Sequence, residues 1–355
     1  MALDAEILGV IEAWHRHGAT LGDDAFNDLA LRLFAYQLRY NEPYARYCEA
    51  LGRTEPRSWE QIPAVPAAAF KEAALTTFDP MAAALVFETS GTTNGAGGLH
   101  YMETALLYDA ALLAGFDRFV LAEGTRFRYF NLVPNPQEHP RSSLGYMMAR
   151  VAERFGDGRA GFYVRDDELR IDAFTADVTT AIDQGRPVCI AATAFSLVAL
   201  LDAMNVRDLT FALPRNSRVM QTGGFKGRSR VVDQDELGAA ICDRFGVMRN
   251  DLVSEYGMTE LSSQCYAIGT PAYAAPPWLR TRAVGPERIT LPNGAIGALL
   301  HVDLANRSSC VAIQTEDLGI VTAAGLVLLG RDREAPLRGC SLGAEDLAKR
   351  ETGRL

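Results

Sequence analysis

The sequence predicts an α/β protein, with a mixed or parallel sheet flanked by helices and a small β subdomain later in the chain. From residue 80 onward, short apolar runs rich in β-forming residues alternate with longer helix-like stretches. Alternation of this kind indicates parallel strands joined by crossover helices. After Ala283 the pattern changes to short strand-like pieces separated by turns at 292–294 and 324–325. A chain of 355 residues is long enough for about two domains.

The first part of the chain, to about Leu75, is predicted to be mostly helical. Phe26, Leu29 and Leu33 recur at the spacing of one helix face, and residues 41–43 end the pattern. We then expect strands over residues 85–87, 129–133, 188–192, 219–221 and 252–254, and helices over 103–121 and 234–245. Four segments are expected: a helical N-terminal segment packed on the core (1–78), an α/β core (79–282), a small β subdomain (283–330) and a hinge-like C-terminal tail (331–355).

Composition and charge exclude several classes of function. The formal net charge of −9 disfavours nucleic acid and anionic membranes as partners, because both carry negative charge themselves. No run of about 18 apolar residues could span a membrane, and residues 1–20 lack the basic start of a signal peptide. The six cysteines form no CxxC pair and the five histidines show no metal spacing, so we expect a reduced, cytoplasmic protein without a structural zinc.

A hydroxyl- and glycine-rich stretch predicts a phosphate-binding loop. Residues 88–98 read Glu-Thr-Ser-Gly-Thr-Thr-Asn-Gly-Ala-Gly-Gly and lie between an apolar run over 82–87 and a helical pattern. Hydroxyl groups donate hydrogen bonds, and glycines let backbone N–H groups approach an anion closely. The stretch fits neither the kinase-type nor the dinucleotide motif, because Ala96 replaces a required glycine of the first and the last glycine of the second is missing. We expect the order strand, loop, helix, with the loop beyond the carboxyl end of a strand of the parallel sheet.

Three further motifs follow the loop. Residues 254–260 read Ser-Glu-Tyr-Gly-Met-Thr-Glu, residues 315–319 read Thr-Glu-Asp-Leu-Gly, and residues 329–332 read Leu-Gly-Arg-Asp. In this order, TSGTT, YGMTE, T-x-D-L-G and GR-D resemble the motifs of the adenylate-forming superfamily, which includes acyl-CoA synthetases, adenylation domains and luciferases. Over nearly its whole length the chain is most similar to the acyl-protein synthetase (long-chain-fatty-acid–protein ligase) of bacterial luminescence and to relatives near phenylacetate-CoA ligase.

The resemblance implies how the chain would bind the phosphates of ATP and a Mg²⁺ ion. A carboxylate that attacks the α-phosphate must overcome repulsion between anions, so the site needs a cation and preorganised donors. Glu260 resembles the Mg²⁺ ligand of the superfamily, and Thr259 would contact the α-phosphate. The β- and γ-phosphates would be held by the loop residues Thr89, Ser90, Gly91, Thr92 and Thr93.

The resemblance also implies a nucleoside site. Tyr256, followed by Gly257, would stack on adenine. Asp317 would accept hydrogen bonds from the ribose hydroxyls, with Arg331 assisting. The backbone edge beside adenine and the acyl pocket would be formed by Gly223 and Gly224. Lys226 and Arg228 either steer pyrophosphate or an acidic substrate, or they form part of a solvated face.

The chain departs from the general superfamily pattern in two places. It stops at Leu355, where most members continue into a lid domain whose lysine assists adenylation, so we expect the large N-terminal domain without this lid. Catalysis would then rely on Mg²⁺, the loop donors and Arg331. The loop also lacks its usual trailing lysine. His100 resembles a basic position of the closer relatives and is a candidate catalytic residue, but it could equally be a hydrogen-bonded residue at a helix start.

Cys340 is a candidate acyl carrier. In the luminescence synthetase, a C-terminal cysteine takes the acyl group from the adenylate as a thioester and passes it to the reductase, and Cys340 matches this residue in its Arg-Gly-Cys context. The arginines Arg331, Arg333 and Arg338 lie nearby in the sequence. Positive neighbours lower the pKa of a thiol and enlarge the thiolate fraction that attacks. The alternative is a partly buried, inert cysteine at a hinge.

Together these motifs predict an ATP- and Mg²⁺-dependent acid–thiol ligase. It would activate a carboxylic acid, fatty or otherwise apolar, as an acyl-adenylate and transfer the acyl group to a thiol, which could be Cys340 and then a partner protein. The nearest alternative gives the acyl group directly to coenzyme A or to the phosphopantetheine arm of a carrier protein. A third alternative is a non-catalytic nucleotide-binding subunit of a partner complex.

Overall fold

The computed structural model describes residues 2–89, 97–121, 124–166, 168–223 and 234–331. The chain divides into two compact units, each built from stretches that are separate in the sequence. As far as they are described, unit 1 comprises residues 1–114, 258–264 and 274–355, and unit 2 comprises residues 115–257 and 265–273. The four segment boundaries expected from the sequence stay a prediction. Within the described ranges, no helix is both long and apolar enough to cross a membrane.

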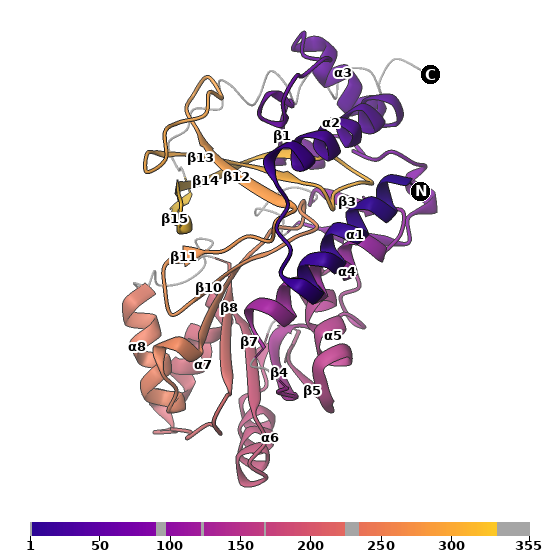
Figure 1. The fold of residues 1–355 in the computed structure, drawn as a ribbon. Coiled ribbons are helices and arrows are strands. Elements are labelled where there is room, and N and C mark those ends of the chain that lie inside the picture. Colours follow the sequence, from indigo (N-terminus) through magenta and orange to yellow (C-terminus); the bar gives the residue numbers. More distant parts are fainter. Residues whose placement is uncertain (1, 90–96, 122–123, 167, 224–233, 332–355) are drawn as a thin grey trace. The chain divides into compact units, whose positions relative to one another are not determined.

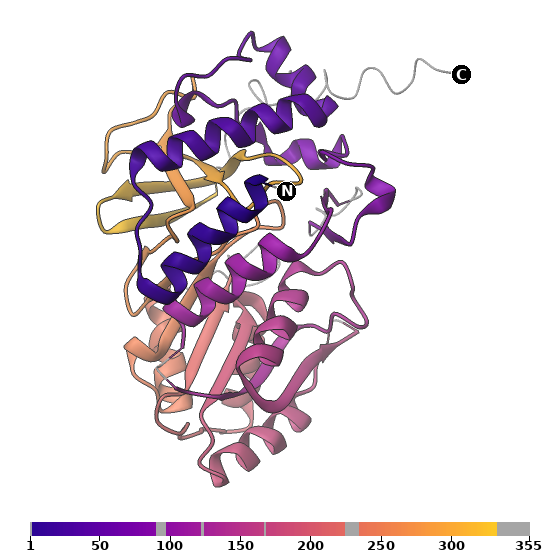
Figure 2. The same ribbon diagram turned by 45° about the vertical axis from the view of Figure 1, so that its right-hand side comes forward.

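Unit 1 begins with three helices, as the sequence predicts. They are α1 (Ala2–His17), α2 (Asp23–Tyr40) and α3 (Glu42–Ala50). The break predicted at 41–43 is a single residue, because the Asn41 side chain accepts a hydrogen bond from the backbone N–H of Tyr44 at 3.2 Å and caps α3. Helices α1 and α2 lie side by side (Figure 2), and Arg32 of α2 donates to the Glu6 carboxylate at 2.8 Å.

An antiparallel sheet carries the core of unit 1. Its strands follow the order β12 (Leu279–Val284), β13 (Ile296–Asp303), β14 (Ala312–Thr322) and β15 (Gly325–Arg331), and β1 (Val65–Pro66) pairs in parallel with β14. This sheet confirms the β region predicted after Ala283. Phe26 and Leu33 of α2 belong to one buried cluster with Val302 and Ile313 of the sheet. The apolar helix face read from the sequence therefore packs on these strands. Three short 3₁₀ helices complete the connections: η1 (Trp59–Gln61), η2 (Ala67–Lys71) and η3 (Pro80–Ala82).

The loop of residues 88–98 joins two antiparallel strands, which differs from the prediction. The strands are β2 (Leu85–Glu88) and β3 (Leu99–Met102), and α4 (Leu106–Phe119) begins only after them. The expected order of strand, loop and helix is therefore wrong. The strand before the loop is also not part of the parallel sheet, contrary to the prediction, because β2 and β3 form a sheet of their own. His100 and Met102 are buried while their neighbours are partly exposed, which is the alternation of a strand.

Unit 2 contains a seven-stranded sheet in the order β10-β9-β8-β7-β4-β5-β6. The strands are β4 (Phe127–Pro134), β5 (Gly156–Arg165), β6 (Glu168–Leu169), β7 (Val188–Thr193), β8 (Arg218–Thr222), β9 (Leu252–Tyr256) and β10 (Cys265–Ile268). From β9 to β5 all neighbours are parallel, and only the edge strands β10 and β6 pair antiparallel. The predicted parallel strands over 129–133, 188–192, 219–221 and 252–254 are confirmed as β4, β7, β8 and β9.

Helices cover both faces of this sheet, as a buried parallel sheet requires. They are α5 (Ser143–Phe155), α6 (Ile171–Asp183), α7 (Ala194–Val206) and α8 (Gln234–Phe245), with η4 (Arg249–Asp251) and β11 (Ala272–Tyr273) completing the unit. Figure 1 shows α6, α7 and α8 on one face and α5 on the other. Phe174 of α6, Leu197 of α7 and Ile241 of α8 pack in one buried cluster with Ile190 of β7. The helix predicted over 234–245 is α8.

Candidate functional site

The residues that the sequence singles out fall in both units. Six lie in unit 1 and three in unit 2, and the unit boundary passes between Gly257 and Met258, inside the 254–260 motif. The unit 1 residues are Thr89, His100, Thr259, Glu260, Asp317 and Arg331, and the unit 2 residues are Gly223, Tyr256 and Gly257. Ser90, Gly91, Thr92, Thr93, Gly224, Lys226, Arg228 and Cys340 lie outside the described residues.

In unit 2, the carboxyl ends of two neighbouring strands bring Gly223 and Tyr256 to the same edge of the sheet. Thr222 ends β8 opposite Glu255 of β9, so the residues that follow them are also neighbours. Gly223 has a φ of 71°, and a Cβ there would meet no atom within 4 Å. Glycine is therefore required by backbone conformation and not by crowding. Ligands of parallel sheets bind at this edge.

Glu255 is a buried carboxylate that the sequence analysis did not single out. Its side chain accepts a hydrogen bond from the Thr222 hydroxyl, and only 5% of the residue is exposed. Burial raises the pKa of Glu255 to about 7, against the lowering effect of the Thr222 hydrogen bond. In the sequence, only its position in a predicted strand could have indicated this carboxylate. Side chains alternate along a strand, so Glu255 points to the face opposite Tyr256. A carboxyl group that titrates near neutrality thus lies next to the predicted nucleotide edge.

The substitution Glu255→Gln should make the stability of the protein less dependent on pH. Because the folded pKa is raised, this carboxyl stabilises the fold fully only below its ordinary pKa of 4.5, and the contribution is lost as pH rises through about 7. At about 1.4 kcal/mol per pKa unit, the raised pKa lowers the free energy of unfolding at pH 8 by on the order of 3 kcal/mol relative to acidic pH. Urea unfolding at pH 5 and pH 8 measures it, with exposed Glu168→Gln as control. If Glu255→Gln and wild type keep the same stability difference at both pH values, the raised pKa is wrong.

In unit 1, Thr89 closes the base of the hydroxyl-rich loop. Its backbone N–H donates to the Gly98 carbonyl at 2.8 Å, and its hydroxyl accepts from the Gly98 N–H at 2.7 Å. A Cβ on Gly97 would lie 2.4 Å from the Thr89 carbonyl oxygen, so only glycine fits there. Thr89 thus anchors the loop, while its hydroxyl hydrogen can still be donated.

His100 is a neutral, buried side chain that holds the backbone of Thr259. Its Nδ1 lies 2.7 Å from the Thr259 carbonyl oxygen, and a carbonyl only accepts, so Nδ1 carries the proton. Burial lowers the pKa of His100 to about 4, and the hydrogen bond to Thr259 raises it only in part. The ring of Phe70 packs edge-on against the His100 ring, with the two ring centroids 5.7 Å apart. His100 lies on strand β3 and not at a helix start; its catalytic role stays a prediction.

Glu260 lies in a turn held by side chains from distant parts of unit 1. The Glu260 carbonyl accepts from Asn306 Nδ2 at 2.8 Å, and the Leu261 N–H donates to the Met258 carbonyl at 3.0 Å. The next residue, Ser262, donates its backbone N–H to Asp303 Oδ2 at 3.0 Å. Glu260 itself is 8% exposed. Neither Asp303 nor Asn306 lies in one of the sequence motifs.

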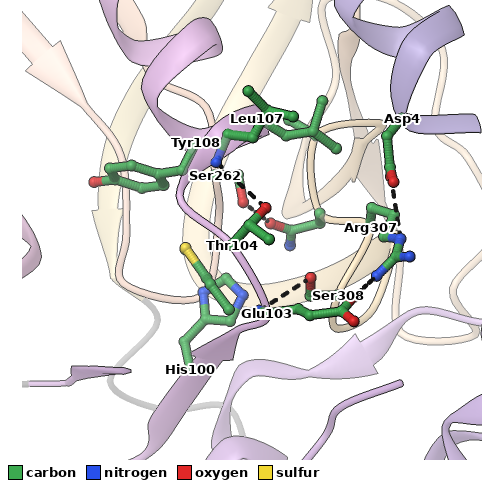
Figure 3. Close-up of a pocket in the computed structure, with 13 residues that line it drawn as sticks. Asp4, His100, Glu103, Thr104, Leu107, Tyr108, Ser262, Arg307 and Ser308 are labelled. Carbon is green, nitrogen blue, oxygen red and sulfur yellow. Dashed lines mark hydrogen bonds and ion pairs between the residues drawn. The ribbon is translucent and has the colours of Figure 1, made fainter. Parts of the chain in front are cut away.

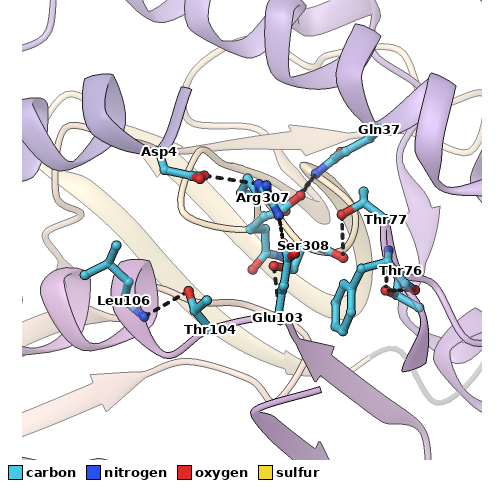
Figure 4. Close-up of polar contacts among 11 residues, drawn as sticks. Asp4, Gln37, Thr76, Thr77, Glu103, Thr104, Leu106, Arg307 and Ser308 are labelled. Carbon is cyan, nitrogen blue, oxygen red and sulfur yellow. Dashed lines mark hydrogen bonds and ion pairs between the residues drawn. The ribbon is translucent and has the colours of Figure 1, made fainter. Parts of the chain in front are cut away.

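A small pocket of about 50 Å³ lies beside this turn, with room for a water molecule or two. His100, Ser262 and Arg307 line it, as Figure 3 shows. Arg307 pairs with Asp4 at 3.1 Å and with Glu103, so two carboxylates already balance its charge. Figure 4 shows the same pairs within the wider set of polar contacts. The pocket is therefore not an anion site.

Asp317 and Arg331 contact each other directly. They face one another across β14 and β15, and Arg331 Nε donates to Asp317 Oδ1 at 2.9 Å. The Thr315 hydroxyl accepts from the Asp317 N–H at 3.1 Å and donates to the Leu299 carbonyl at 3.0 Å, which fixes the strand here. The two side chains are 17% and 56% exposed, so the pair lies at the surface of unit 1. The structure thus brings together two residues that the sequence analysis had joined only by resemblance.

The sequence of the chain matches a known protein family over most of its length. The family described as acyl-protein synthetase, LuxE, matches residues 22–347. The chain belongs to this family. The family covers the described site residues of both units, from Thr89 to Arg331, and the match agrees with the resemblance found in the sequence. Among curated proteins, none matches the chain.

Solved structures show that this LuxE-family chain has the fold of adenylate-forming enzymes. A 2-hydroxyisobutyryl-CoA ligase in complex with its adenylate and CoA aligns with a TM-score of 0.65 at 14% identity, over 89% of this chain and 77% of that chain. ATP-bound MatB from Rhodopseudomonas palustris aligns with a TM-score of 0.51 at 16% identity, over 72% of this chain and 49% of that one. The predicted fold class is confirmed. The chain spans about half the length of MatB and of the amide bond synthetase McbA from Marinactinospora thermotolerans.

Proposed function

We propose that this LuxE-family chain activates a carboxylic acid with ATP and Mg²⁺ and transfers the acyl group to a thiol. In the first step, a carboxylate oxygen bonds to the α-phosphorus of ATP and the bond to the β-phosphate oxygen breaks, which releases pyrophosphate. In the second step, a thiolate bonds to the carbonyl carbon and AMP leaves. The observation that carries the proposal is family membership over residues 22–347, which covers every described motif residue.

The residues of unit 1 fit a Mg²⁺ ion bound together with ATP. Among the described residues, no three His, Cys, Asp or Glu side chains gather that could hold a metal. Mg²⁺ is commonly bound by one or two carboxylates together with substrate phosphates, and Glu260 offers such a carboxylate on a well-anchored turn. The ion would supply positive charge to the phosphates during attack. Glu260 would hold it, while Thr259 would contact the α-phosphate and Thr89 would anchor the phosphate loop.

The residues proposed to contact the nucleoside follow from the family resemblance, for each unit by itself. Asp317 would accept hydrogen bonds from the ribose hydroxyls, and Arg331, already bonded to Asp317, would keep the carboxylate oriented. Gly223 and Tyr256 lie at the carboxyl edge of the parallel sheet and would frame adenine. The acid is proposed to be fatty or otherwise apolar. The proposed acceptor is Cys340, followed by a partner protein.

Pyrophosphate exchange over a panel of acids tests this function. The purified chain should exchange labelled pyrophosphate into ATP only when a suitable carboxylate and Mg²⁺ are present. Intact-mass measurement should then show an acylated chain. Exchange without any mass gain would instead favour coenzyme A or a carrier protein as acceptor. Absence of exchange with every acid, together with retained ATP binding, would favour a non-catalytic nucleotide-binding subunit.

The substitution Asp317→Ala should raise the KM for ATP in this exchange about 10- to 100-fold. Hydrogen bonds to a charged group contribute about 1.5–3 kcal/mol, and every 1.4 kcal/mol is tenfold in affinity. The neighbouring Glu316 is exposed, so Glu316→Ala is the matched control and should keep the wild-type KM. Equal KM values for the two variants would rule out Asp317 as the ribose acceptor.

A further inference from the structure

A buried polar network lies behind the Glu260 turn and involves residues with no assigned role. Asp303 is the last residue of β13 and Asn306 lies in the turn after it, and they are 0% and 1% exposed. Asp303 Oδ2 accepts from the Ser262 N–H at 3.0 Å, and Asp303 Oδ1 accepts from the Ser263 hydroxyl at 2.8 Å and from the Ala305 N–H at 3.0 Å. A buried carboxylate is stable only when it is well hydrogen-bonded, so these donors are fixed in place.

Asn306 connects this network to Glu260 itself. Its Nδ2 donates to the Glu260 carbonyl at 2.8 Å and to the Cys310 carbonyl at 3.1 Å. Its Oδ1 accepts from the Ser262 hydroxyl at 2.6 Å. One amide therefore bonds to the residue that carries the candidate metal ligand and to the residue two positions later. These hydrogen bonds leave the Glu260 backbone little freedom to rotate.

Gln37 of α2 holds the same network from its other side. Its Nε2 donates to the Asn306 carbonyl at 2.7 Å, and its Oε1 accepts from the Val311 N–H at 2.7 Å. Gln37 contacts the backbone of the 303–311 turn, and none of these hydrogen bonds reaches residues 258–264. Asn306 and Gln37 are thus two buried amides in one network, of which only the first bonds to the Glu260 turn.

We propose that Asn306, supported by Asp303, is a positioning residue that fixes the Glu260 carboxylate for metal binding. The inference rests on the proposed function, because it gives Glu260 the role of Mg²⁺ ligand. Groups that orient a metal ligand commonly change metal affinity or activity about 10- to 100-fold when they are removed. Here the orientation acts through the backbone carbonyl of the ligand residue and through the turn that follows it.

A pair of isosteric substitutions tests this role. Asn306→Leu removes the hydrogen bonds to Glu260 and Ser262 with little change of volume, and Gln37→Met makes the same kind of change on the other side of the turn. We measure the Kd of Mn²⁺ by electron paramagnetic resonance, with a non-hydrolysable ATP analogue bound. Asn306→Leu should raise this Kd about tenfold or more, whereas Gln37→Met should stay within about twofold of wild type. The Mg²⁺ concentration for half-maximal pyrophosphate exchange should shift in parallel.

A milder variant keeps the test decisive if Asn306→Leu does not fold. Ser262→Ala removes only the hydroxyl bond to Asn306 Oδ1 and should raise the Mn²⁺ Kd by about two- to threefold. If Gln37→Met weakens Mn²⁺ binding as much as Asn306→Leu, or if the Asn306 and Ser262 variants bind like wild type, the positioning role is overturned. Wild-type protein that neither binds Mn²⁺ with the analogue nor exchanges pyrophosphate would instead overturn the proposed function.

Discussion

Glu260→Ala should reduce carboxylate-dependent pyrophosphate exchange by about 10³-fold or more. A metal ion that neutralises the phosphates contributes several kcal/mol to the transition state, and each 1.36 kcal/mol is tenfold in rate. The turn that carries Glu260 is fixed by Asn306 and Asp303, so a shorter side chain at this position has little chance to recover the lost contact. The rate is measured at saturating acid and ATP over a range of Mg²⁺ concentrations.

The control for this substitution is a carboxylate outside the turn. Glu287 is exposed in unit 1, and Glu287→Ala should exchange like wild type. Circular dichroism and thermal unfolding show whether Glu260→Ala is folded. A folded Glu260→Ala protein that exchanges at the wild-type rate would remove Glu260 from the metal site, and the mechanism proposed for unit 1 would have to be abandoned.

Cys340→Ser should abolish self-acylation while it leaves pyrophosphate exchange within about twofold of wild type. The thiolate is the nucleophile in thioester formation, and a serine hydroxyl is far less acidic than a thiol. Exchange requires only the adenylate, so it does not need Cys340. Cys340 lies outside the described residues, and the prediction follows from the family resemblance of its sequence context. Intact mass after incubation with acid, ATP and Mg²⁺ is the measurement.

Cys242 provides the matched control. Four of the described cysteines are buried, whereas Cys242 of α8 is partly exposed. Burial nevertheless raises the pKa of Cys242, which lowers its thiolate fraction. Cys242→Ser should therefore acylate like wild type. Unchanged acylation of Cys340→Ser would mean that another residue, or an external thiol, accepts the acyl group.

Periodicity predicted the longer elements well and the short ones poorly. Helices α2 and α8 and the parallel strands β4, β7, β8 and β9, all of them predicted, are each five or more residues long. The four-residue strand β3, directly after a glycine-rich loop, is too short to show a clear alternation, so no strand was predicted between the loop and the following helix. Boundaries and short elements depend on pairing partners, which a single sequence does not display.

Some residues of the candidate site could likewise be predicted from the sequence and others could not. Motif order predicts Glu260, Asp317 and Arg331 as site residues, because family motifs are local in sequence. The residues that hold the Glu260 turn were missed, since the bonds from Asn306 and Asp303 cross 46 and 41 positions of the chain. Glu255 was missed for another reason: its raised pKa depends on burial against a neighbouring strand, which residue type alone does not indicate.

The bond between Gln37 and Asn306 has a consequence for biosynthesis. The two residues are 269 positions apart. At ribosomal speeds of 5–20 residues per second, α2 emerges roughly 15–50 s before its partner turn exists. During that interval the apolar side of this nascent helix has no strand to cover it. Nascent chains therefore expose this apolar helix face for most of their synthesis. We expect chaperones that bind unfolded chains to determine how much active protein a cell obtains.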